Sequence, residues 1–126
     1  MVFRTPVGRA RGLGSAQSGF RHWWMQRVTA VALIPLTLWL GVAIAALPGA
    51  SYSDVVGWVG EPVNAIFLMS LVVATCYHAA LGLQVVVEDY VHSERVKIGT
   101  IMVLNLLFAL AVLVAFYAFL RIAFLG

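Results

Sequence analysis

Three long apolar runs constrain this chain more than any other feature of its sequence. Residues 28–48, 63–87 and 98–120 contain no Asp, Glu, Lys or Arg. A bilayer core about 30 Å thick requires about 20 helical residues, so each run is long enough to cross a membrane. Because 63% of the 126 residues are hydrophobic and only 10% are charged, a soluble surface could not be covered. The sequence therefore predicts an all-α integral membrane protein with three transmembrane helices.

The predicted organisation is one membrane domain preceded by a short tail. The expected spans are residues 28–48, 63–90 and 97–121, all approximate. Residues 1–20 are rich in glycine, serine and arginine and have little to bury, which predicts a flexible basic tail before the 21–126 domain. The 49–62 connection is expected to lie along the outer interface, because it contains aromatic residues and glycines. Three helices leave many faces uncovered, so a partner chain is expected.

The distribution of basic residues predicts the orientation in the membrane. Seven basic residues lie before the first span or between the second and third spans: Arg4, Arg9, Arg11, Arg21, Arg27, Arg95 and Lys97. Only Arg121 lies on the opposite side. The positive-inside rule then places the N-terminus in the cytoplasm and the C-terminus in the periplasm. The basic tail is thus a topology signal, and no nucleic-acid partner is expected; an Arg-rich start is also typical of a transit peptide.

His78 is the one ionisable side chain within the apolar runs that carries a candidate function. Ionisable residues inside a span are rare and are usually functional. Three interpretations are open: a neutral ring bonded to a neighbouring helix, a member of a proton relay, or a metal or haem ligand. No Asp, Glu or other His lies in the three apolar runs to continue a relay. The haem interpretation is favoured by small residues near His78 on the helix, Ala74 and Gly82, which leave room for a flat macrocycle; a second ligand would come from another polypeptide.

Asp89 and Tyr90 end the second run. Asp89 follows His78 by eleven residues, so it returns to nearly the same face about 16 Å nearer the cytoplasm. An ordinary helix end at the headgroups explains both residues. The functional interpretation is a quinone site, in which a phenol donates a hydrogen bond to a quinone oxygen and the carboxylate orients the phenol or passes protons.

Two motifs resemble a known family. Residues 27–31 form an R-x-T-A start to the first span, and the second span carries an H-x(3)-G-x(6)-D-Y pattern from His78 to Tyr90. Together with the three-span topology, they resemble the small hydrophobic membrane anchor of bacterial succinate dehydrogenase, respiratory complex II. The resemblance implies that His78 is an axial ligand of haem b and that Tyr90 hydrogen-bonds ubiquinone, with Asp89 beside it. Arg27 would lie near the haem propionates or the quinone; His22 has no assigned role.

The resemblance also implies the rest of the complex. The larger, companion membrane anchor would supply the other haem ligand, and an iron–sulfur subunit and a flavoprotein would dock on the cytoplasmic face of the bacterial inner membrane. The chain would then be part of a succinate:quinone oxidoreductase, without a catalytic site of its own. The alternatives are the anchor of a quinol:fumarate reductase, a cofactor-free membrane scaffold and a small transporter.

Overall fold

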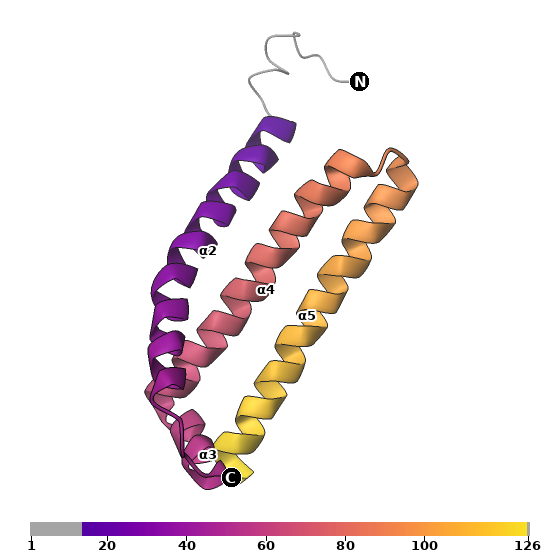
Figure 1. Cartoon of the computed structure of the whole chain (residues 1–126). Helices are drawn as coiled ribbons and strands as arrows, with labels where there is room; N and C mark the ends of the chain where they lie inside the picture. Colours follow the sequence, from indigo (N-terminus) through magenta and orange to yellow (C-terminus); the bar gives the residue numbers. More distant parts are fainter. Residues whose placement is uncertain (1–13, 126) are drawn as a thin grey trace.

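The computed structural model describes residues 14–125, and their side chains from Gly19 onward; most of the predicted tail lies outside this part of the chain. The described residues form helices joined by short connections, with no strand among them (Figure 1). The helices are α2 (Gly14–Ala45), α3 (Tyr52–Gly60), α4 (Pro62–Tyr90) and α5 (Glu94–Leu125). Three of them are long and apolar enough to cross a membrane, over Gly19–Ala45, Pro62–Tyr90 and Glu94–Leu125. The predicted fold class is confirmed.

The three long helices lie in an open row with α4 in the middle (Figure 1). Within the described residues, α4 packs against both α2 and α5, and these two outer helices do not contact each other. Few side chains are buried in the row: the apolar ones are Leu71, Leu81 and Val87, all on α4. In lipid, helices associate through close packing and hydrogen bonds and not through burial from water. Most of the surface of α2 and α5 is thus left for lipid or for another polypeptide.

The helix ends follow local sequence signals. Pro62 occupies the first turn of α4, where its missing N–H costs nothing. At the other end, the Val91 N–H donates to the Val87 carbonyl, 2.9 Å away, and the helix stops at Tyr90. Helix α2 begins at Gly14, inside the segment predicted as a tail, because helical backbone can continue past the apolar run where water or headgroups satisfy its ends.

A short helix occupies the connection that the sequence placed along the outer interface. Ser51 is the N-cap of α3 and forms a reciprocal capping box with Asp54, whose carboxylate accepts from the Ser51 N–H at 2.8 Å. These hydrogen bonds from the Ser51 hydroxyl and backbone hold the pKa of Asp54 below its ordinary value of 3.8. The Ser-x-x-Asp spacing is the sequence signal that starts this helix.

An aromatic cluster joins α3 to the two neighbouring spans. The Trp39 ring of α2 stacks on Trp58 of α3 at 5.6 Å between centroids and meets the Phe67 ring of α4 edge-on at 5.2 Å. The Asn64 amide also donates to the Trp58 carbonyl at 2.9 Å. The end of the row that carries α3 is therefore held together by side-chain packing, and the ribbons of α2 and α4 lie farther apart at the opposite end (Figure 1).

Candidate functional site

A line of polar side chains on α2 faces α4. His22, Gln26 and Thr29 are spaced by four and three residues, so they share one face of the helix. Thr29 is 7% exposed and is the one buried polar residue in the part of the chain that the structure describes. The facing part of α4 runs from His78 to Gly82 and contributes an imidazole, a backbone carbonyl and a glycine.

The His78 ring is held across this interface through one of its two nitrogens. Its Nδ1 lies 3.0 Å from the Thr29 hydroxyl. Its Nε2 has no hydrogen-bond partner among the described residues. In that part of the chain, the only fully buried side-chain nitrogen or oxygen without a partner is Oε1 of Gln26, so Nε2 of His78 is not a fully buried atom. The Nε2 of His78 is therefore unpaired and not fully enclosed by the rest of the chain. This geometry leaves one nitrogen available for a ligand.

A second hydrogen bond joins the helices one turn farther along α4. The Nε2 of His22 donates to the Leu81 carbonyl at 3.2 Å. Beside it, a Cβ added at Gly82 would lie 3.8 Å from the Gln26 amide nitrogen, an ordinary van der Waals contact. The glycine thus lies against α2 of the same chain. His22, which the sequence left without a role, helps to fix the register of α2 against α4.

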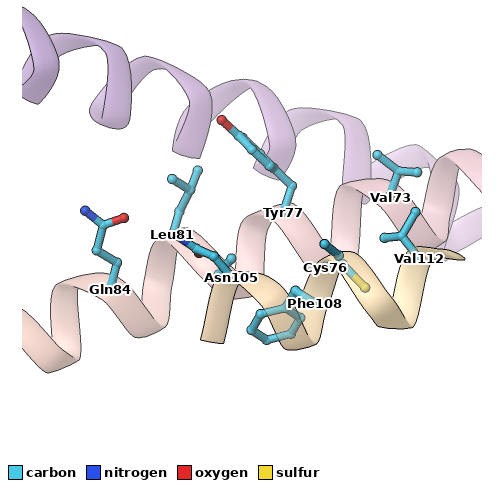
Figure 2. A pocket seen from close by; sticks show the side chains of 10 residues that line it. Val73, Cys76, Tyr77, Leu81, Gln84, Asn105, Phe108 and Val112 are labelled. Atoms are coloured by element: carbon cyan, nitrogen blue, oxygen red, sulfur yellow. The ribbon is translucent and has the colours of Figure 1, made fainter. Parts of the chain in front are cut away.

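Two apolar grooves border α4. One, of about 620 Å³, lies along α4 on the side of α2, with Phe116 of α5 at its edge; its lining includes Met25, Thr29, Ala74 and Tyr77, though not His78. The other, of about 350 Å³, lies between α4 and α5 (Figure 2). In Figure 2 the Tyr77 side chain extends from α4 toward α2, away from the α5 residues that line the same groove. Both volumes fall within the range of small-molecule sites.

Asp89 and Tyr90 lie at the end of α4, away from His78. Both side chains are exposed, Tyr90 by 78%, and neither makes a hydrogen bond to another described residue. Twelve helical residues separate Tyr90 from His78, which corresponds to about 18 Å along the helix axis. The fold of this chain therefore does not bring the two candidate sites together, and both open outward.

Arg27 is also exposed and lies beside a tryptophan. Its guanidinium carbon is 5.3 Å from the centre of the Trp23 ring, within the range of a cation–π interaction. Trp23, Trp24 and Phe20 form a cluster of exposed rings with centroids 6.3–6.5 Å apart. No carboxylate of the described residues pairs with Arg27. A cation beside an aromatic cluster is typical of a membrane interface.

The comparisons with known proteins agree on one family. The family model described as succinate dehydrogenase/fumarate reductase transmembrane subunit matches residues 1–118. A succinate dehydrogenase hydrophobic membrane anchor subunit from Rickettsia bellii is 36% identical over 90% of both chains. Proteins of the same name from Rickettsia conorii and Paracoccus denitrificans are 33% and 31% identical, the latter over 91% of this chain and 88% of its own.

The chain belongs to the succinate dehydrogenase/fumarate reductase transmembrane subunit family. The resemblance inferred from the two motifs is thus confirmed, as is the multi-pass membrane location. The candidate residues of this family member lie on two elements: Arg27 on α2, and His78, Asp89 and Tyr90 on α4, with His78 in its middle part and the other two at its end.

Sequence reasoning missed the residue that contacts the candidate haem ligand. Thr29 belongs to the R-x-T-A motif, and the motif alone assigns it no role of its own. The spacing of His22, Gln26 and Thr29 is a detectable signal, because polar residues recurring on one face of a span usually meet another helix. Which helix they meet, and at what height, is visible only in the folded chain.

Proposed function

We propose that this chain is the small membrane anchor of a succinate dehydrogenase and that, with a companion anchor, it binds haem b and ubiquinone. Its role is to place a haem ligand and a quinone hydrogen-bond donor in the membrane, so that electrons from succinate reach ubiquinone. Membership of the family, the three spans and the names of the relatives support this proposal.

The haem part depends on one observation: His78 lies within a span, is held through Nδ1 and has an unpaired, accessible Nε2. A neutral imidazole nitrogen with these properties suits an axial position on haem iron. Among the described residues, no three His, Cys, Asp or Glu side chains converge on one point. A single histidine fits a porphyrin, which brings most of the iron ligands itself, and the companion anchor would supply the opposite ligand. The bound haem would add a one-electron carrier to the complex.

The quinone part depends on Tyr90, with Asp89 beside it. The phenol is exposed and unpaired within the described chain, so it can donate to a quinone oxygen without breaking a bond of its own. The Asp89 carboxylate is near enough in sequence to orient the phenol or to accept protons from the cytoplasm. Arg27, which is exposed on α2, would form an ion pair with a haem propionate or would line the quinone pocket.

The partners follow from the exposed surfaces and from the charge. The uncovered faces of α2 and α5 suit a second anchor and lipid. The basic N-terminal part and the connection between α4 and α5 would face the cytoplasm of a bacterial inner membrane. There they would meet the iron–sulfur subunit, with the flavoprotein bound to it.

The test replaces His78 with Ala in the whole complex. After purification, the dithionite-reduced absorption spectrum should lose its b-type haem bands, while the flavoprotein and the iron–sulfur subunit still co-purify. His92→Ala is the matched control, because His92 is exposed beyond the end of α4 and should leave the spectrum unchanged. A full haem spectrum in the His78→Ala complex would refute the ligand assignment.

A second function is favoured by the family description, which names fumarate reductase beside succinate dehydrogenase. The anchor would be built in the same way, with electrons flowing from quinol to fumarate. Measured rates of succinate oxidation by ubiquinone and of fumarate reduction by a quinol in one preparation would distinguish the two.

A further inference from the structure

We propose that Thr29 is a positioning residue for the haem ligand: its hydroxyl accepts a hydrogen bond from the Nδ1–H of His78, which keeps the ring proton on Nδ1 and leaves the Nε2 lone pair free for iron. The inference rests on the proposed function, since it assigns a role to a residue of this chain in holding the ligand. It goes further, because it states which tautomer the ring adopts and which residue selects it.

The Thr29 hydroxyl has one proton and three hydrogen-bond partners within reach. Oγ1 of Thr29 lies 2.8 Å from the Met25 carbonyl, 3.2 Å from the Gln26 carbonyl and 3.0 Å from Nδ1 of His78. The two carbonyls can only accept, and the hydroxyl has one proton, so that proton is directed at the carbonyls. In that arrangement a hydroxyl lone pair faces Nδ1, and Nδ1 is the donor of the hydrogen bond.

A donating Nδ1 fixes the tautomer of the His78 ring. A neutral imidazole carries one N–H, so a proton on Nδ1 leaves Nε2 as an acceptor with a free lone pair. Nε2 is the nitrogen without a partner among the described residues, and it is accessible. The hydrogen-bond geometry and the requirement of the metal therefore select the same tautomer.

The Thr29 side chain is held rigidly on α2. Thr29 is β-branched and its hydroxyl bonds to the carbonyl one turn earlier, so its side chain has little rotational freedom on the helix. Thr29 is only 7% exposed, so water would not readily take the place of the hydroxyl in a variant that lacks it. The acceptor for Nδ1 is thus fixed to the α2 backbone, and the ring is oriented by packing of α2 on α4.

The experiment compares Thr29→Val and Thr29→Ser in the whole complex. Valine keeps the shape without the hydroxyl, and serine keeps the hydroxyl. Partners of this kind commonly contribute about 10–100-fold to metal affinity, so Thr29→Val should retain haem that much less tightly. Its haem midpoint potential should also rise, because an imidazole without the hydrogen bond donates less electron density and stabilises ferric iron less. Thr29→Ser should match the unaltered complex in both measurements.

Thr37→Val is the matched control. The Thr37 hydroxyl makes the same pair of bonds to its own helix, 2.6 Å to the Leu33 carbonyl and 3.1 Å to the Ile34 carbonyl, and has no histidine partner among the described residues. Its replacement should change neither haem retention nor potential. If Thr29→Val behaves like Thr37→Val while His78→Ala has no haem, the role of Thr29 is refuted and the proposed function stands. If His78→Ala keeps its haem, the proposed function itself fails.

A measurement on the unaltered complex covers the case in which Thr29→Val does not assemble. An experimental structure with haem bound should show iron on Nε2 of His78 and the Thr29 hydroxyl within about 3.2 Å of Nδ1. Iron bound through Nδ1, or a different partner for that nitrogen, would overturn the inference.

Discussion

Replacing Tyr90 with Phe should impair quinone reduction without disturbing the rest of the complex. The Tyr90 side chain is 78% exposed, and its hydroxyl makes no hydrogen bond within the described chain. Its removal therefore costs this chain no interaction of its own, and the whole effect falls on what the phenol binds. His78 lies about 18 Å away along α4, so the haem spectrum should not change.

The size of the effect follows from the one hydrogen bond that is lost. A partner left unsatisfied in a dry site costs about 1–3 kcal/mol. Because about 1.4 kcal/mol corresponds to a factor of ten, kcat/KM for ubiquinone should fall about 5- to 150-fold. Electron transfer from succinate to a soluble dye that accepts from the iron–sulfur or flavin centres should be unchanged.

The assay measures both reactions in the same purified complex. Tyr52→Phe is the matched control, since Tyr52 is 83% exposed and lies on α3, at the opposite end of the row (Figure 1). It should leave both rates unchanged. If Tyr90→Phe reduces ubiquinone as fast as the unaltered complex, the phenol does not bind the quinone. If both rates fall together in Tyr90→Phe, the change has acted on assembly.

Three further predictions concern the end of the row that carries α3. Ser51→Ala should weaken α3 by about 0.5–2 kcal/mol, seen as faster amide exchange in that helix. The Asp54 pKa is lowered by folding, so the cap contributes fully above the unfolded pKa and is lost as pH falls through the lower folded value; the protection of α3 amides relative to their intrinsic exchange rates should decrease there, and unchanged protection would contradict this. Trp39→Leu removes the ring contacts of Trp39 with Trp58 and Phe67, which together stabilise the packing by about 1–3 kcal/mol. The temperature at which the complex dissociates should therefore fall, and an unchanged temperature would show that these contacts contribute little.

The start of the 52–60 helix shows what short-range signals contribute. The Ser-x-x-Asp spacing at residue 51 is readable in the sequence and specifies a helix start through bonds three residues apart. The contact of Trp39 with Trp58 and Phe67 is not readable in this way, because it joins three helices that are distant in sequence. Local capping can be predicted from a short stretch, and packing between elements cannot.

The sequence by itself determined that three helices cross a membrane, that His78 lies within the second and that Tyr90 ends it. Length and hydrophobicity decide these points, since a backbone in lipid must bond internally whatever its neighbours are. Only the tertiary structure decided that Thr29 meets Nδ1 of His78 and that His22 meets the Leu81 carbonyl. The spans are apolar on almost every side, so periodicity does not say which faces meet or in what register. A few hydrogen bonds and close contacts between α2 and α4 make that choice.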